Sequence, residues 1–259
     1  MKRKVYEQLL EWKNQEHHKP LLLNGVRQCG KTYVLKEFGR REFDSLAYVS
    51  CDRNVNLQAI YSGDFDVARI IQGLSALTGV DIIPGKTLIF LDEVQAFPQA
   101  LEALKYFCED APEYHIAVAG SLLGVALHAG VSFPVGKVQT LRLFPMDFEE
   151  FLMAMGEEQL LKLMHSHDYE LMNAFHEKLK DLLRQYYYVG GMPEVVKAFV
   201  ENKLLNQVRS LQNEILSNYA SDFSKHAPSQ EVPRIDMVWQ SILGQLSKEN
   251  KKFVYGVLK

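Results

Sequence analysis

An apolar run that ends in a glycine turn constrains this chain more than any other feature of its sequence. Residues 21–35 read LLLNGVRQCGKTYVL: three leucines, a turn with Gly25 and Gly30, then Lys31-Thr32 and a helical sequence. Adjacent apolar residues indicate a strand buried on both faces, as in a parallel sheet. Glycine permits positive φ angles and close backbone approach. The stretch therefore predicts a strand–loop–helix unit whose loop amides converge on one anion.

The turn matches the full Gly-x-x-x-x-Gly-Lys-Thr phosphate-binding pattern, also called Walker A. We call residues 25–32 the phosphate loop. Lys31 is expected to reach the β- and γ-phosphates as a catalytic point charge, and the Thr32 hydroxyl to ligate Mg²⁺. A glycine-rich turn that binds nothing is the alternative, because the bare pattern arises by chance in roughly one chain in a hundred of this length. The residues expected to contact the nucleotide are Gly25, Arg27, Gln28, Cys29, Gly30, Lys31, Thr32 and Tyr33.

A second apolar run ends in two carboxylates. The segment TLIFLDE, residues 87–93, ends with Asp92-Glu93. Such an ending is typical of the acidic strand, or Walker B, of a nucleoside-triphosphatase. Asp92 is expected to hold Mg²⁺ together with Thr32, and Glu93 to orient and deprotonate the attacking water. Alone, such an ending more often marks a strand that leaves the core. After a phosphate loop, it predicts nucleotide binding and hydrolysis. ATP is favoured over GTP because the sequence lacks Asn-Lys-x-Asp.

Ser121 is the third catalytic candidate, after Lys31 and Glu93. It ends the strand-like run HIAVAGS, residues 115–121. If that strand lies between the loop strand and the acidic strand, Ser121 is expected to sense the γ-phosphate. A serine that caps the following helix, LLGVALHAG, is an equally open alternative.

Strand-like runs alternate with helical sequences in the first part of the chain. SLAYVSC, residues 45–51, and KVQTLRL, residues 137–143, bring the number of expected strands to five. Such alternation predicts an α/β fold with a parallel sheet covered on both sides, here a P-loop NTPase core over residues 1–146. Residues 147–224 show only helical periodicity and are expected to form a helical lid. Residues 225–259 are expected to contain the linker KHAPSQEVP and the beginning of a further domain.

Five stretches together resemble a known family. GVRQCGKT, FLDEVQ, AGSLLG, LFPMDFEEFL and YVGGMPEVV, in this order, look like the bacterial and archaeal AAA-type ATPases that carry a C-terminal domain of unknown function. The resemblance covers nearly the whole chain. It implies an AAA/RecA-like core of the additional-strand type, a helical lid and a winged-helix-like segment that is cut short here. It also implies ATP and Mg²⁺ as ligands, with hydrolysis coupled to conformational change.

One departure from the family concerns the arginine finger. Members often carry an arginine after a glycine near the fifth strand, where this sequence has Gly136-Lys137. Lysine lacks the bidentate fork of arginine, which puts that role at Lys137 in doubt, and Arg142 is the alternative. This motivates a second hypothesis: a slowly hydrolysing, nucleotide-dependent switch that binds nucleic acid or a protein partner through its C-terminal region. Assembly into a homo-oligomer is a further possibility that the sequence leaves open.

Composition limits the partners and the compartment. The net charge of −3 over 259 residues gives no support for binding of nucleic acid by the whole molecule. No apolar run has transmembrane length, so we expect no membrane association. The cysteines Cys29, Cys51 and Cys108 show no framework or metal-ligand spacing, which favours a reducing, cytoplasmic location.

Three further features have alternative interpretations. Cys29 could be redox-sensitive, because a helix N-terminus lowers a thiol pKa, or simply a small residue tolerated in the loop. Tyrosines 186–188 could stack nucleic-acid bases or, more simply, pack between lid and core. The histidines 165, 167 and 176 are expected to be solvated rather than to share a metal ion.

Overall fold

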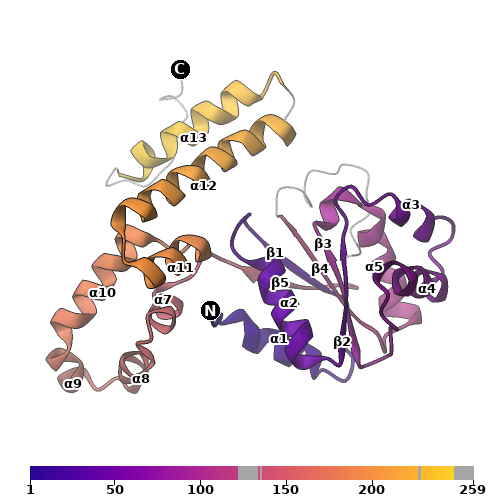
Figure 1. Cartoon of the computed structure of the whole chain (residues 1–259), viewed down its shortest axis with the longest axis horizontal. Coiled ribbons are helices and arrows are strands. Elements are labelled where there is room, and N and C mark those ends of the chain that lie inside the picture. The colour runs from indigo at the N-terminus through magenta and orange to yellow at the C-terminus, as the bar shows by residue number, and fades with distance from the viewer. Residues whose placement is uncertain (122–133, 135, 227–228, 248–259) are drawn as a thin grey trace. The chain divides into compact units, whose positions relative to one another are not determined.

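The computed structural model describes residues 1–121, 134, 136–226 and 229–247 of the chain (Figure 1). The chain divides into two compact units, Met1–Val200 and Glu201–Lys259. Within the described ranges, no helix combines the length and the hydropathy that crossing a bilayer requires.

The first unit is built around a parallel sheet of five strands, as the sequence predicts. The strand order is β2-β3-β4-β1-β5, so that β4 lies between β1 and β3. All neighbouring strands are parallel, and their carboxyl ends therefore meet at one edge of the sheet. The order confirms the predicted core in which one strand separates the loop strand from the acidic strand. The bounds are β1 Leu21–Gly25, β2 Ser45–Ser50, β3 Thr87–Asp92, β4 His115–Ser121 and β5 Gln139–Leu143.

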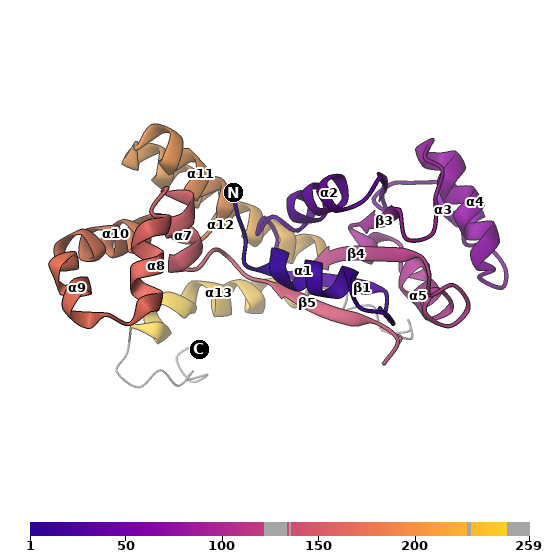
Figure 2. The same cartoon turned by 90° about the horizontal axis from the view of Figure 1, so that it is seen from below.

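Helices cover both faces of the sheet because the central strands are apolar on both sides. Leu21 and Leu23 pack into one hydrophobic cluster and Leu22 into the other, as the alternation of side chains along a strand requires. The first cluster includes residues of α1 (Val5–Lys13) and α2 (Lys31–Glu42). Figure 2 shows α1 along β5.

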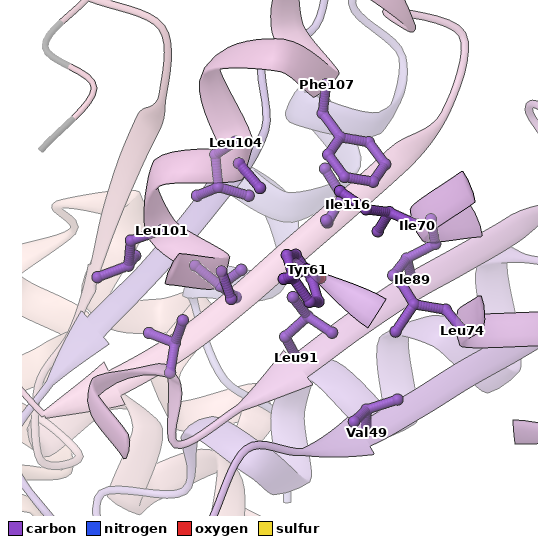
Figure 3. Packing of buried hydrophobic residues seen from close by; sticks show 14 of the residues in the cluster. Val49, Tyr61, Ile70, Leu74, Ile89, Leu91, Leu101, Leu104, Phe107 and Ile116 are labelled. Carbon is purple, nitrogen blue, oxygen red and sulfur yellow. The ribbon is translucent and has the colours of Figure 1, made fainter. Parts of the chain in front are cut away.

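The second cluster lies on the opposite face of the sheet. It holds buried residues of α3 (Asn56–Ile60), α4 (Val67–Thr78) and α5 (Gln99–Asp110), together with the short 3-10 helix η1 (Val94–Ala96). Figure 3 shows side chains of α4 and α5 in contact with the strands; its labelled members include Ile70, Leu74, Ile89, Leu91, Leu101, Leu104, Phe107 and Ile116. This packing fixes the position of β3, which carries the acidic pair.

A pair of histidines lies at the edge of the sheet opposite the phosphate loop. The rings of His18 and His115 are stacked with their centroids 3.8 Å apart. Trp12 contacts both rings edge-on, and His115 Nε2 lies 3.2 Å from the carbonyl oxygen of Lys13. Burial lowers the pKa of both imidazoles, and that of His115 falls to about 4.

Five helices follow the sheet, and the last of them ends two residues past the first unit: α7 Phe148–Ala154, α8 Glu158–Ser166, α9 Tyr169–Ala174, α10 His176–Val189 and α11 Pro193–Asn202. They have a small apolar cluster of their own around Leu152, Leu160 and Leu182. The α7 helix begins one residue after the predicted start of the helical lid.

The helical sequence around His165 and His167 is interrupted at His167. His167 has φ 56° and ends α8, after which the side chain of Asp168 caps α9. His165 instead lies 3.0 Å from Glu149. Across the part of the chain that the structure describes, no group of three His, Cys, Asp or Glu residues could hold a metal ion.

Among its described residues, the second unit has two helices that begin after α11, α12 Leu205–His226 and α13 Val232–Leu246. The predicted linker, residues 225–233, overlaps both helices: its first two residues end α12 and its last two begin α13. The rings of Tyr219 and Trp239 stack with centroids 6.0 Å apart. Because residues 248–259 lie outside the described ranges, the winged-helix-like segment over 225–259 stays a prediction. The predicted boundary between a core (1–146) and a lid (147–224) also stays a prediction.

Candidate active site

The phosphate loop joins β1 to α2, as predicted. Two of its residues have positive φ angles, 61° at Gln28 and 93° at Gly30, and Gly30 is the N-cap of α2. Left-handed residues of this kind turn successive backbone amides toward one side, where they can surround an anion. The first amides of α2 have no acceptor within the helix and add its positive dipole end.

Gly25 is required by the sheet as well as by the loop. A Cβ atom at this position would lie 2.2 Å from the carbonyl oxygen of Leu143 in β5. No side chain fits there, because the backbone of β5 occupies the space. The sequence pattern identifies the glycine, but it does not show that a neighbouring strand imposes it.

The Cys29 side chain packs against the end of β5. Its sulfur is buried and lies 3.5 Å from the carbonyl oxygen of Leu143. Burial raises the pKa of this thiol, and the neighbouring Lys31 only partly opposes the effect. Of the two interpretations of Cys29, the buried thiol therefore favours the small residue tolerated in the loop over the redox-sensitive one.

Lys31 is buried and folded back onto the loop. Its Nζ donates hydrogen bonds to the carbonyl oxygens of Gly25, at 2.9 Å, and Val26, at 2.8 Å. An ammonium group held at the mouth of a ring of amides is complementary to phosphate oxygens. Of the other loop residues, the side chain of Gln28 is exposed and that of Arg27 is half-buried. Tyr33 lies in the first turn of α2 and is exposed.

The acidic pair lies next to the loop. Thr32 Oγ1 donates a hydrogen bond to Asp92 Oδ2 at 2.8 Å, although 60 residues separate the two in sequence. The buried Asp92 also accepts the backbone N–H of Glu93 at 3.1 Å on Oδ1. Tyr48 of β2 donates to Oδ2 at 3.4 Å. Three donors therefore orient this carboxylate toward the loop.

Glu93 adopts an uncommon backbone conformation. With φ 53° and ψ 43° it is left-handed, a region that residues other than glycine rarely occupy. Its carboxylate accepts a hydrogen bond from Gln95 Nε2. Strained residues of this kind concentrate at functional sites, where the surrounding structure holds them.

Ser121 lies at the same edge of the sheet. It is buried at the end of β4 and pairs in register with Gly25 of β1, which brings it beside the start of the phosphate loop. The helix that it could cap falls in residues 122–133, outside the described ranges. The two interpretations of Ser121 therefore stay open.

The two basic residues near β5 lie at opposite edges of the sheet. Lys137 precedes β5 at the opposite edge of the sheet and forms an ion pair with Glu109, 2.9 Å away. Arg142 pairs in register with Asn24, close to the loop, and is exposed. Within one chain, Arg142 is therefore nearer to the phosphate loop than Lys137 is.

Sequence reasoning missed several residues that shape the site. Tyr48 and Gln95 orient the acidic pair, and no motif spacing marks them. Arg3 and Glu150 form a buried ion pair against the loop. Among the three tyrosines, Tyr186 packs on Phe148 and Phe151 and donates to Met146 O at 2.9 Å, which supports the packing interpretation for that residue.

The residues present fit a magnesium–nucleotide complex. Mg²⁺ takes hard oxygen ligands, with one or two carboxylates and the substrate phosphates rather than a full protein cage. The Thr32 hydroxyl and the Asp92 carboxylate supply such oxygens at one point, beside the lysine and the loop amides. Strand order, phosphate loop and acidic strand together define the class of P-loop nucleoside-triphosphatases.

Comparison with known proteins defines the family. A family profile described as "AAA domain" matches residues 17–152, more than half of the chain, and the chain belongs to this family. A second profile, described as "Domain of unknown function (DUF8612)", matches residues 180–259. No curated protein matches. By family and fold, the chain is an AAA-type P-loop ATPase.

One solved structure shows the same fold at low sequence identity, and a second match is weaker. The Walker-type ATPase PABY2304 of Pyrococcus abyssi has a TM-score of 0.57 and 15% identity, covering 94% of this chain and 80% of that one. Drosophila ORC bound to DNA has a TM-score of 0.44 and 14% identity, over 96% of this chain and 68% of the other.

Proposed function

We propose that this protein binds ATP with Mg²⁺, hydrolyses it, and couples hydrolysis to a change in conformation. The observation that carries the proposal is the hydrogen bond from Thr32 Oγ1 to Asp92 Oδ2. A hydroxyl at the end of a phosphate loop and a carboxylate at the end of the acidic strand meet at one point. A turn that happened to be rich in glycine would have no reason to bring them together.

Lys31 and the loop amides bind the phosphates in this proposal. The ammonium group of Lys31 exchanges its two carbonyl partners for oxygens of the β- and γ-phosphates, which form stronger, charge-assisted hydrogen bonds. Thr32 and Asp92 would hold Mg²⁺, which when bound offsets phosphate charge. Tyr48 keeps the Asp92 carboxylate facing that position.

Glu93 acts as the general base. Its carboxylate orients a water molecule and takes the proton as the water attacks the γ-phosphorus, while Gln95 holds the carboxylate in place. Ser121, at the end of the strand between loop and acidic strand, senses the γ-phosphate. These assignments make Lys31, Glu93 and Ser121 the catalytic residues.

The helices that follow the sheet receive the signal. Met146, directly before α7, donates its backbone N–H to Gly191 O at 2.6 Å, and Gly191 lies just before α11. Loss of the γ-phosphate and Mg²⁺ releases the contacts that order such elements, a recurring form of nucleotide switch. The sequence positions of α7–α11 correspond to the helical lid that the family resemblance implies.

The decisive experiment measures ATP binding and hydrolysis by the full chain and its Lys31→Ala and Glu93→Gln variants. Lys31→Ala should lose nucleotide affinity. Glu93→Gln should keep ATP bound but hydrolyse it about 100-fold to 10,000-fold more slowly, the usual contribution of a general base. Chelation of Mg²⁺ should abolish turnover. Unchanged affinity and turnover in Lys31→Ala would contradict the proposal.

The same assay separates the alternative, a slowly hydrolysing switch. Single-turnover hydrolysis far slower than nucleotide binding, at every protein concentration, would favour the switch. A specific rate that increases with protein concentration would indicate a homo-oligomer that completes the site. Turnover stimulated by DNA, with a steep salt dependence, would indicate a nucleic-acid partner.

A further inference from the structure

Arg3 precedes α1 and is buried against the phosphate loop. Its side chain is 5% exposed, and all three kinds of guanidinium nitrogen donate hydrogen bonds. Nε donates to Glu150 Oε1 at 3.1 Å, Nη1 to Cys29 O at 2.9 Å and Nη2 to Phe144 O at 2.6 Å. One side chain therefore joins the phosphate loop, the segment after β5 and helix α7.

The bond to Cys29 determines which way a loop amide points. Because a trans peptide is planar, its C=O and N–H groups face opposite directions. Holding the Cys29 carbonyl on Arg3 therefore turns the Gly30 N–H away from Arg3. Gly30 has φ 93°, and glycine populates both signs of φ readily, so this peptide needs an external restraint to keep one orientation.

Glu150 ties the same guanidinium group to the first turn of α7. Its carboxylate, 6% exposed, also accepts the backbone N–H of Lys4 at 2.7 Å and that of Asp147 at 3.3 Å. Asp147 in turn accepts the Glu150 N–H at 2.9 Å, which completes a capping box. A movement of the start of α7 therefore moves the group that holds the Cys29 carbonyl.

A second contact links the helices to the same loop residue. A Cβ atom on Gly30 would lie 3.7 Å from Arg3 Nη1 and 3.8 Å from Pro193 Cγ, at the start of α11. At Gly191, a Cβ atom would lie 2.2 Å from Met146 O, so the turn before α11 is held against the segment before α7. Gly30 is thus flanked by both Arg3 and the α11 terminus.

We propose that Arg3 is a positioning residue that links the orientation of the Cys29–Gly30 peptide to the placement of α7. Phosphate binding then favours the arrangement in which Glu150 holds Arg3, and α7 in that arrangement favours phosphate binding, because such coupling is reciprocal. This inference rests on the proposed function, since it assumes that the loop binds nucleotide phosphates. Buried ion pairs often add little net stability, and the best-attested use of such pairs is in register and switching.

The test compares Arg3→Ala, Arg3→Lys and Glu150→Gln with wild-type protein and a matched control, Lys4→Ala. Lys4 is the adjacent residue and pairs with Asp147 and Glu149 at the surface. The measurements are the Kd of a fluorescent ADP analogue, KM and kcat for ATP, and deuterium exchange of Phe148–Ala154 with and without ADP.

Arg3→Ala should weaken ADP binding about tenfold or more, the loss expected for one hydrogen bond from a charged donor. KM should rise while kcat stays within a few-fold, because Arg3 touches no reacting group. Arg3→Lys should not rescue affinity, since lysine cannot reach three acceptors in the same geometry. In wild-type protein ADP should slow exchange in α7, and this protection should shrink in Arg3→Ala and Glu150→Gln but not in Lys4→Ala.

A purely structural role for Arg3 predicts a different result. A lower melting temperature with unchanged Kd, and unchanged protection of α7 by ADP, would overturn the proposal while leaving the proposed function intact. Wild-type protein that binds no nucleotide would overturn the proposed function itself. If Arg3→Ala does not fold, Arg3→Lys and Glu150→Gln still test the link, since each keeps a side chain of similar size.

Discussion

The imidazole rings of His18 and His115 stack on one another at the edge of the sheet opposite the phosphate loop, nearly parallel at 8°. Trp12 and Phe43 contact the His115 ring from the sides. Burial is the main cause of the lowered pKa of both imidazoles. The positive charge of a protonated His18 or of Lys13 opposes protonation of His115 further. His115 therefore stays neutral in the folded protein well below the usual pKa of histidine, and the pKa of His18 is lowered in the same direction.

This pair should make the protein less stable in mild acid. In the unfolded chain both histidines take up protons near pH 6.5, whereas folded His115 does so only near pH 4. The unfolded state binds more protons between these values, so the free energy of unfolding falls as the pH is lowered through this window, by about 2–3 kcal/mol for His115. Urea titrations from pH 7 to pH 4 should show this loss.

Replacement of His115 checks the assignment. His115→Phe keeps an aromatic ring among Trp12, His18 and Phe43 and should flatten the pH dependence of stability over the same window. The exposed His167, changed to Gln, serves as the control and should leave the dependence as it is in wild-type protein. Equal slopes in all three proteins would contradict the prediction.

Gly25→Ala should destabilise the fold rather than only weaken nucleotide binding. The new Cβ would lie 2.2 Å from Leu143 O, and the clash is with backbone, which has little freedom to move aside. We expect a loss of about 2 kcal/mol or more in the free energy of unfolding without nucleotide, comparable to overpacking in a core. Thermal unfolding without nucleotide measures it.

The matched control is Gly244→Ala in α13. No atom lies within 4 Å of a Cβ built there, and alanine is the better helix former by about 1 kcal/mol. This variant should be as stable as wild-type protein or more so. If Gly25→Ala also retained full stability, the steric requirement from β5 would be disproved.

Tyr48→Phe should raise the Mg²⁺ concentration that half-maximal ATPase activity requires. The Tyr48 hydroxyl donates to Asp92 Oδ2, and its loss removes one of the donors that orient this carboxylate. We expect a few-fold increase, about 1 kcal/mol, because the acceptor is a carboxylate but the O···O distance of 3.4 Å is long for a hydrogen bond. Tyr187→Phe, at a residue 75% exposed, is the control. An identical Mg²⁺ dependence in both variants would count against the role of Tyr48.

The three cysteines should differ in their reaction with an alkylating reagent. Cys108 is half-buried, whereas Cys29 and Cys51 are buried and their thiol pKa values are raised, that of Cys51 to about 12. Because the thiolate is the reactive form, native protein at pH 8 should be labelled first at Cys108. Mass spectrometry of digested protein measures this order. Early labelling of Cys29 would restore the redox hypothesis for the loop.

The sequence predicted the parts of this protein that local patterns encode. Apolar runs such as TLIFLDE define strands, and their alternation with helices implies a parallel sheet whose carboxyl ends meet at one edge. The proximity of Thr32 and Asp92 follows from that topology together with the loop motif. The observed bounds of β3, Thr87–Asp92, differ from the predicted ones by a single residue.

What the sequence did not reveal depends on tertiary contacts. Arg3 hydrogen-bonds to two backbone carbonyls and one carboxylate, and the spacing of these partners follows no motif. The thiol pKa of Cys29 depends on burial, which outweighs the helix N-terminus considered from sequence. The break at His167 did leave a local signal, since Asp168 is a preferred N-cap residue.

The position of Arg3 also decides which fragments of this protein are suitable for biochemistry. The AAA profile begins at residue 17, so an expression fragment designed on that boundary would omit α1 and the arginine that holds the Cys29 carbonyl. Such a fragment would keep every residue of the nucleotide-binding signature and yet leave the Gly30 peptide free to rotate. Weak affinity measured on it would reflect where the gene was cut, not the chemistry of the intact enzyme.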